Sequence, residues 1–214
     1  MKRFAACLCA AAVLACLTVR AADSDDKKDS EGWIKMFDGE TLKGWKPNEH
    51  ADNWKVEDGK IVATGERSHL FYVGDDEKNP AAFTDFHFKA DVMTTPGSNS
   101  GIYFHTKWQN DGWPDNGYEA QVNQTHTDPV KTGSLYNVVK NFQAPAKDNE
   151  WYTEEIIVKG KHITIKANGK TIVDYEENPK DIQGNRKLSK GTFALQAHDP
   201  KSKTYYRNIM IKPL

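Results

Sequence analysis

Cysteine is nearly absent from this chain of 214 residues, and its three copies, Cys7, Cys9 and Cys16, all lie close to the N-terminus. From residue 17 onward the chain contains no thiol. This excludes a disulfide framework, a cysteine nucleophile and a thiolate metal site from the main body of the protein. Its stability must come from a packed core, and the chain is long enough to form one.

An excess of basic residues is also missing. When Lys2, Arg3 and Arg20 of the N-terminal segment are left out, 26 of the 29 basic residues remain, against 30 acidic ones. This balance does not favour binding to nucleic acid or to an anionic membrane. No apolar run reaches the roughly 20 residues that span a bilayer. We therefore expect no nucleic-acid partner and no membrane span, and the sequence indicates no particular oligomeric state.

The first 21 residues are typical of an export signal peptide. Lys2 and Arg3 give a basic start, an apolar run covers 4–17, and residues 19–21 form a small-x-small cleavage site. We expect export to the periplasm or the medium. Cleavage before Cys16, in a lipobox-like stretch, is an alternative that would anchor the protein by a lipid, and a buried helix is a second alternative.

The remainder of the chain is predicted to form one domain. Residues 22–31 are polar and of mixed charge, which is typical of a disordered spacer. Residues 32–214 contain no internal repeat and no linker. They also lack the i, i+3, i+4, i+7 spacing of apolar residues that predicts long helices.

Short runs of alternating apolar and polar residues, divided by turn residues, extend from Trp33 to the C-terminus instead. Tight hairpins are expected at Asp58-Gly59 and Asn168-Gly169, because such turns need residues that tolerate positive φ. Further strands are expected at 86–93, 101–106, 118–123, 133–139, 151–158, 192–197 and 205–211. Many strands without crossover helices predict an all-β fold, a jelly-roll sandwich of two antiparallel sheets.

Three of these strands carry a polar face of unusual composition. Alternation places the following residues on the side away from the core: Tyr103, His105, Glu119, Gln121, Asn123, Gln196 and His198. Such rigid donors and acceptors suit sugar hydroxyls, which both donate and accept hydrogen bonds. Trp108, Trp113 and Tyr136 could add flat apolar surface for a sugar ring. A merely solvated face is the alternative for each strand taken alone.

The number of carboxylates on this face limits the chemistry. A retaining glycosidase needs two carboxyl groups about 5 Å apart. Glu119, Gln121 and Asn123 supply one carboxylate and two amides, and amides cannot act as nucleophile or general acid. Asp115 and Asp128 lie in flanking loops, where aspartate more often forms turns. The two-carboxylate mechanism is therefore disfavoured.

Eight segments, in order along the chain, resemble those of a known family. They are MFDGETLKGW (36–45), WKVEDG (54–59), NSGIYF (99–104), GYEAQV (117–122), TGSLY (132–136), NG (168–169), LQAH (195–198) and RNI (207–209). The chain resembles the 3-keto-disaccharide hydrolase domain family, long catalogued as a domain of unknown function and abundant in exported bacterial proteins.

The resemblance implies a concanavalin A-like, laminarinase-like jelly roll that acts on glycosides whose C3 hydroxyl has been oxidised to a ketone. Family members often carry an acidic residue at the position of Asn123 and an arginine at that of His105. The first exchange weakens any role of this position as metal ligand or base. The second replaces a fixed charge by a titratable group.

A 3-keto sugar permits a route with fewer carboxylates. The ketone acidifies the C2 proton, a base removes it, the aglycone leaves C1 by β-elimination, and water adds to give net hydrolysis. We predict Glu119 or His198 as the base. The expected substrate-binding residues are Asn99, Tyr103, His105, Trp113, Gln121, Asn123, Tyr136, Gln196 and Arg207. Among them His105, Tyr136 or Arg207 would stabilise the enolate or protonate the leaving oxygen, although a structural role for Arg207 is equally open.

This route requires no cofactor. A divalent ion held by Glu119 and His198 could supply an electrophile, but two ligands are a thin set, so no metal is predicted. The alternatives to an enzyme are a non-catalytic carbohydrate-binding module and a structural sandwich whose polar face is simply wet. Exchange of solvent deuterium into C2 of a 3-keto-glycoside would distinguish the enzyme from the module.

Overall fold

The computed structural model describes residues 29–214, so the expected signal peptide and residues 22–28 of the expected spacer lie outside the described residues. Residues 29–31 are exposed and precede the first strand. The carboxylate of Asp29 accepts the backbone N–H groups of Glu31 and Trp33, which ties this segment to the start of the sandwich.

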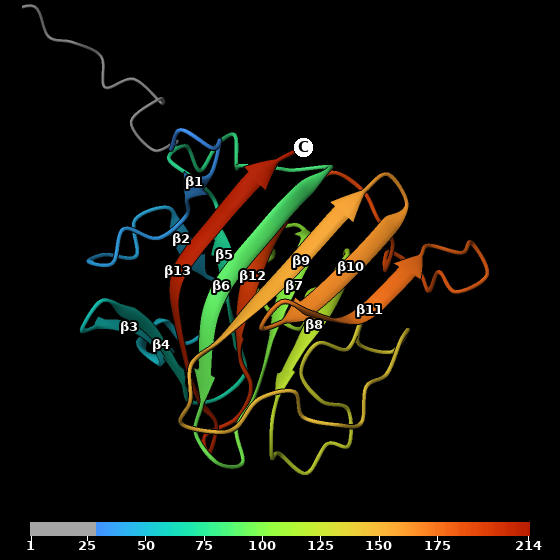
Figure 1. Cartoon of the computed structure of the whole chain (residues 1–214). Coiled ribbons are helices and arrows are strands. Elements are labelled where there is room, and N and C mark those ends of the chain that lie inside the picture. Colours follow the sequence, from blue (N-terminus) through green and yellow to red (C-terminus); the bar gives the residue numbers. More distant parts are fainter. Residues whose placement is uncertain (1–28) are drawn as a thin grey trace, which may run out of the picture.

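Two antiparallel sheets make up the fold, which confirms the predicted jelly-roll sandwich (Figure 1). The eight-stranded sheet has the order β11-β10-β9-β6-β13-β4-β3, with β1 paired to β13, and the five-stranded sheet has the order β2-β5-β12-β7-β8. The strands are β1 (Ile34–Lys35), β2 (Trp45–Pro47), β3 (Trp54–Glu57), β4 (Lys60–Thr64), β5 (Ser68–Tyr72), β6 (Phe86–Thr94), β7 (Asn99–Thr106), β8 (Tyr118–Asn123), β9 (Tyr152–Lys159), β10 (His162–Ala167), β11 (Lys170–Glu176), β12 (Thr192–Ala197) and β13 (Lys203–Pro213). A 3₁₀ turn, η2 (Ala51–Asn53), precedes β3.

The hairpins form where the turn residues predict them. β3 pairs with β4 across Asp58 and Gly59, and β10 pairs with β11 across Asn168 and Gly169. All four turn residues have positive φ, between 45° and 75°. Asparagine, aspartate and glycine tolerate this conformation, so the local sequence determines both turns.

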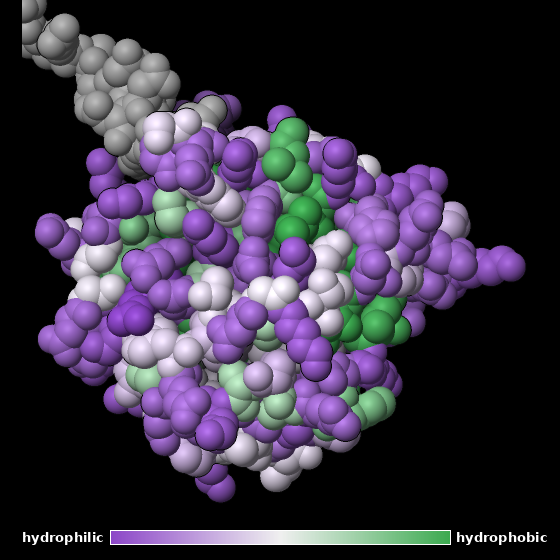
Figure 2. Space-filling view, viewed as in Figure 1, coloured by the Kyte–Doolittle hydropathy of each residue, from purple (hydrophilic) through white to green (hydrophobic). Residues whose placement is uncertain are grey.

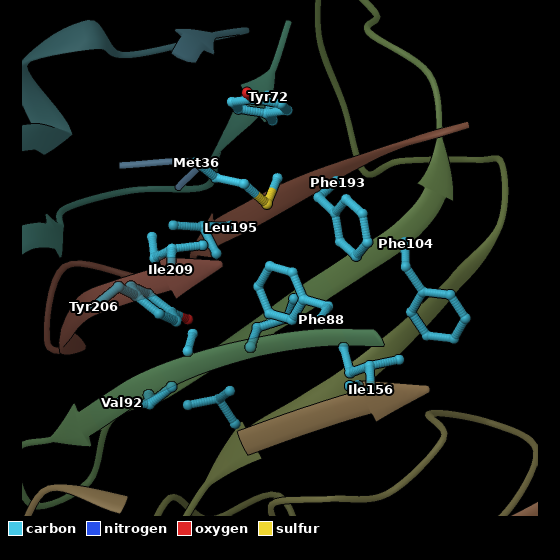
Figure 3. Packing of buried hydrophobic residues seen from close by; sticks show 14 of the residues in the cluster. Met36, Tyr72, Phe88, Val92, Phe104, Ile156, Phe193, Leu195, Tyr206 and Ile209 are labelled. Atoms are coloured by element: carbon cyan, nitrogen blue, oxygen red, sulfur yellow. The ribbon is translucent and has the colours of Figure 1, made fainter. Parts of the chain in front are cut away.

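The core lies between the two sheets. Buried and half-buried residues alternate along all nine positions of β6, because one side of this strand faces the other sheet. Figure 3 shows Phe88 of β6 beside Phe193 of β12, and their rings stack with centroids 4.7 Å apart. The outer face of the eight-stranded sheet, seen in Figure 2, is mostly hydrophilic. The apolar side chains that point inward from the strands therefore hold the two sheets together.

Two parts of the predicted strand pattern are wrong. Residues 133–139 form turns, since Gly133 and Asn137 have positive φ and Leu135 bridges to both Ala120 and Val139. This segment packs along the edge of β8. Such packing also requires spaced apolar residues, and for this reason its sequence resembles that of a strand. β5 was not predicted, because all five of its residues are buried and its sequence shows no alternation.

Within 29–214, no helix has the length and apolar character needed to cross a bilayer.

Candidate functional site

A pocket of about 150 Å³ opens on the face of the five-stranded sheet that points away from the core. Alternate residues of β7, β8 and β12 point into it, while their neighbours Ile102, Ala120 and Leu195 join the core. The lining residues are Asn99, Tyr103, Trp113, Glu119, Gln121, Tyr136, Arg186, Gln196 and His198. All of these except Arg186 were predicted site residues, and we call this space the Glu119 pocket.

Glu119 is almost fully buried in this pocket, with 4% of its surface exposed. Its Oε1 accepts a hydrogen bond from Nε2 of Gln196 at 3.1 Å, and the hydroxyl of Tyr103 also hydrogen-bonds to it. Burial raises the pKa of Glu119 to about 7, against the opposing effects of these bonds and of the positive charge of Arg186. Near neutral pH both protonation states are present, so the group can donate or accept a proton.

Gly101 of β7 provides the space that Glu119 occupies. A Cβ atom at position 101 would lie 2.2 Å from Oε1 of Glu119, well inside van der Waals contact. The carboxyl group therefore lies directly over the backbone of the neighbouring strand. Only glycine allows this close approach without displacing Glu119.

His198 directly follows β12 and is paired with Asp199. Nδ1 of His198 lies 2.9 Å from Oδ2 of Asp199, which also accepts the hydroxyl of Ser202 at 2.6 Å. Burial acts to raise the pKa of Asp199, but hydrogen bonds from Ser202, His198 and the backbone of Lys201 outweigh it and hold that pKa below its usual value. The anionic Asp199 fixes a proton on Nδ1 and leaves Nε2 of His198 as the basic nitrogen.

His126 lies beside this pair, with its ring centroid 5.5 Å from that of His198. Ligand atoms of His126, His198 and Asp199, which we call the acid–imidazole cluster, lie within 4.8 Å of one another and could together hold a divalent ion. Nδ1 of His126, however, accepts the backbone N–H of Asp128 at 3.0 Å. This places the proton of a neutral imidazole on Nε2, so His126 is a hydrogen-bond donor in this arrangement.

Amide and phenol groups fill the rest of the Glu119 pocket. Nε2 of Gln121 donates to Oδ1 of Asn99 at 3.0 Å, and the hydroxyl of Tyr136 donates to Oδ2 of Asp128 at 3.2 Å. Oε1 of Gln196 is buried and has no partner among residues 29–214. Each amide keeps hydrogen-bonding capacity for a ligand, which suits the recognition of sugar hydroxyls.

Trp113 forms one wall of the pocket and remains 42% exposed. Its ring centroid lies 5.6 Å from that of His198. The loop that carries it is fastened at Gly112, whose N–H donates to Glu49 and whose carbonyl accepts the amide of Asn48. A fixed and partly exposed indole can pack against the apolar face of a sugar ring.

Besides Asp199 and His126, the sequence analysis missed two further residues at the site. Arg186 comes from the loop between β11 and β12, which has no periodicity that could place it. His69 lies on β5 opposite Gln196 and against Trp113, with a ring-centroid distance of 5.4 Å to the latter. Burial lowers the pKa of His69 to about 3, and neither ring nitrogen has a partner in the described part of the chain. Its position on this face would follow from alternation once β5 is known.

Three predicted site residues lie outside the pocket. His105 has a φ of 55° at a register shift between β7 and β12, and this turns its ring away from Tyr103 and toward Phe86. Its Nε2 donates to the carbonyl of Thr84, its Nδ1 accepts the N–H of Ser189, and burial lowers its pKa. His105 is thus a neutral structural residue at the end of β7.

Arg207 and Asn123 also have structural positions. Arg207 belongs to β13 of the other sheet, with its guanidinium 3.9 Å from the ring centroid of Trp151 and Nε 3.5 Å from Asp91. The amide of Asn123 donates to the carbonyls of Asp128 and Val130, so it shapes the loop after β8. Alternation places Asn123 on the face of Asn99, its partner on β7, but it reports neither loop contacts nor which sheet contains a strand.

Comparison with known proteins identifies relatives over most of the chain. The family model described as the 3-keto-alpha-glucoside-1,2-lyase-like domain matches residues 32–212. A 3-keto-disaccharide hydrolase of Bacteroides thetaiotaomicron is 25% identical over 188 residues, and the match covers 74% of this chain and 64% of that protein. The chain thus spans less than two thirds of that relative's length.

Solved structures share the fold. A structure from Parabacteroides distasonis has a TM-score of 0.73 at 23% identity, with 91% of this chain and 98% of the other covered. The carbohydrate binding module CBM66 from Bacillus subtilis has a TM-score of 0.58 at 14% identity, with 81% and 98% covered. At these identities the likeness concerns the fold alone. Since the family model extends from before β1 into the last residues of β13, the chain belongs to the 3-keto-alpha-glucoside-1,2-lyase-like domain family, that of the 3-keto-disaccharide hydrolases.

Proposed function

We propose that this protein cleaves the glycosidic bond of 3-keto-glycosides by elimination across C1 and C2, followed by hydration. The observation that carries the proposal is the meeting, in one pocket, of a buried carboxyl group with a pKa of about 7, Glu119, and an imidazole paired with an aspartate, His198. One group that can donate a proton and one that can accept it suit successive proton transfers. The family and the name of the Bacteroides thetaiotaomicron relative support the substrate class.

In this proposal His198 is the base. Its Nε2 removes the C2 proton, and the electrons of that C–H bond give an enolate with its charge on the C3 oxygen. When the C3 carbonyl reforms, a C1–C2 double bond forms and the aglycone oxygen leaves C1. Protonated Glu119 donates a proton to that oxygen. Water then adds at C1 and a proton returns to C2, so the sum is hydrolysis.

The enolate needs a positive charge or a strong donor at its oxygen. Arg186 supplies the charge, and the hydroxyl of Tyr103 supplies a donor that stays protonated, because burial raises its pKa well above the usual value. Gln121 and Gln196 orient the ring hydroxyls, and Trp113 packs against the ring. These roles use the pocket residues without a second carboxylate.

The test is turnover of a 3-keto-glucoside in deuterated water by two variants. His198→Ala should lose both cleavage and deuterium incorporation at C2, by about a hundredfold or more. Glu119→Gln should retain incorporation and lose cleavage. His162→Ala, on β10 of the other sheet, is the matched control and should behave as wild type. Wild-type rates in both pocket variants would exclude His198 as base and Glu119 as acid. If Glu119→Gln lost deuterium incorporation and His198→Ala retained it, Glu119 would be the base and His198 the acid.

A non-catalytic carbohydrate-binding module is the second candidate. The partly exposed Trp113 and the fold shared with CBM66 favour it. A module would bind unoxidised glycans and would neither cleave a 3-keto-glycoside nor exchange its C2 proton. If the protein binds such glycans but shows neither reaction, it is a carbohydrate-binding module and not an enzyme.

We also propose that residues 1–21 direct export and that residues 32–214 act as one domain. The N-terminus of the protein recovered from outside the cytoplasm tests the first point. A start at residue 22 supports a cleaved signal peptide, a lipid-modified Cys16 supports the anchored alternative, and an intact Met1 contradicts both.

A further inference from the structure

A second cavity, of about 400 Å³, lies at the other end of the same outer sheet face. Thr192, at the start of β12, lines this cavity, and Gln196 near its end lines the Glu119 pocket. At about 3.3 Å per residue, these two positions are roughly 13 Å apart. A small apolar cluster that includes Ala194 lies between them. The two spaces are therefore separate sites on one face.

Positive charge gathers at this second space, which we call the lysine cavity. Lys46, Lys107 and Lys190 line it, together with one carboxylate, Glu77. Glu77 lies 2.8 Å from Nζ of Lys46 and neutralises it. Within residues 29–214, no salt bridge involves Lys107 or Lys190. The cavity thus keeps a net positive charge that favours an anionic ligand.

The lysine cavity also has features of a sugar site. Trp108 lines it with 37% of its surface exposed, and Nζ of Lys46 lies 4.7 Å from its ring centroid. Thr106, at the end of β7, is completely buried, yet its hydroxyl has no hydrogen-bond partner among the described residues. A buried hydroxyl without a partner is unfavourable, and a ligand hydroxyl at the cavity wall would relieve this.

We propose that the lysine cavity binds a sugar unit that bears a carboxylate or a sulfate group. Lys107 and Lys190 bind the anionic group, Trp108 packs against the ring, and Thr106 hydrogen-bonds to a ring hydroxyl. The volume lies in the range typical of small-molecule sites. This site is independent of the uncharged keto sugar proposed for the Glu119 pocket.

Calorimetric titration at low ionic strength with glucuronic acid, glucose 6-sulfate and glucose tests the proposal. At least one anionic sugar should bind ten times more tightly than glucose, and the stronger of the two identifies the anionic group. The double variant Lys107→Gln/Lys190→Gln should bind it at least tenfold more weakly. Lys159→Gln/Lys170→Gln changes the net charge equally on the other sheet and should leave the affinity unchanged.

Two further variants separate this site from a general charge effect and from the Glu119 pocket. Thr106→Val should weaken binding several-fold without lowering Tm, because the lost hydroxyl has no protein partner. Glu119→Gln should leave the affinity unchanged even if it abolishes turnover. Equal binding of glucose and the anions, no binding of any of the three, or equal loss in the Lys159/Lys170 control would overturn the proposal.

Discussion

Glu154 of β9 should make the protein less stable as the pH rises through the neutral range. The side chain is completely buried between the sheets, and Oε1 has no partner among residues 29–214. The hydroxyl of Tyr152 donates a hydrogen bond to Oε2 of Glu154 at 3.3 Å. Burial raises the pKa of Glu154 to about 8, only partly opposed by that bond and by the backbone N–H of Gly133. At neutral pH this group is therefore an uncharged acid.

The sign and size follow from proton linkage. Between the ordinary pKa of 4.5 and about 8, the folded state holds a proton on Glu154 that the unfolded state has released. The free energy of unfolding then falls by about 1.4 kcal/mol for each pH unit, or roughly 4 kcal/mol over three units. Glu154→Gln keeps the shape of a protonated glutamate but does not titrate, so its free energy of unfolding lacks this dependence on pH.

The assay is urea unfolding of wild type and Glu154→Gln at several pH values between about 5 and 8, followed by tryptophan fluorescence. As the pH rises, the unfolding free energy of the glutamine variant should increase relative to that of wild type by about 1.4 kcal/mol per pH unit. Glu119 also has a raised pKa, but both proteins contain it, so its contribution cancels. Parallel stability curves for the two proteins would refute the reasoning.

Four further predictions concern the Glu119 pocket. Gly101→Ala should lower kcat at least tenfold with little change in Tm, because the new Cβ displaces the carboxyl group; an unchanged kcat would contradict this. The rate should fall as the pH rises through about 7, since Glu119 must be protonated to act as acid, and a pH–rate profile of Glu119→Gln should lack that fall. Trp113→Ala should raise KM several-fold at nearly constant kcat, as steady-state kinetics can measure. Dialysis against EDTA should leave turnover unchanged, whereas a loss restored by a divalent ion would assign a metal to the acid–imidazole cluster.

Strand parity was sufficient to predict most of the pocket. In a regular strand the face of a side chain depends only on whether its position is odd or even, and Glu119, Gln121 and Gln196 lie where parity places them. Parity failed at His105, because a left-handed backbone conformation interrupts the strand geometry there. Parity also does not reveal which sheet contains a strand, so the structural role of Arg207 on β13 stayed an open alternative until the sheet order was known.

Loop residues could not be predicted in the same way. Arg186 reaches the pocket from a long connection whose path depends on tertiary packing. The pairing of His198 with Asp199 follows from two adjacent residues, but only the structure shows that Ser202 and Lys201 turn the aspartate toward the ring. The hairpins were predictable because their turns depend on local residues alone.

The segment that follows β8 has a consequence for solubility. β8 is the last strand of its sheet, and backbone hydrogen bonds cover its outer edge. The N–H of Gln121 donates to the carbonyl of Ser134, and the N–H groups of Gly133 and Tyr136 donate to the carbonyls of Gln121 and Glu119. A bare strand edge can pair with another chain and start aggregation. Because this cover also carries Tyr136 into the Glu119 pocket, a ligand that holds Tyr136 in place would protect the edge as well. A ligand bound in the Glu119 pocket should thus slow aggregation of the protein.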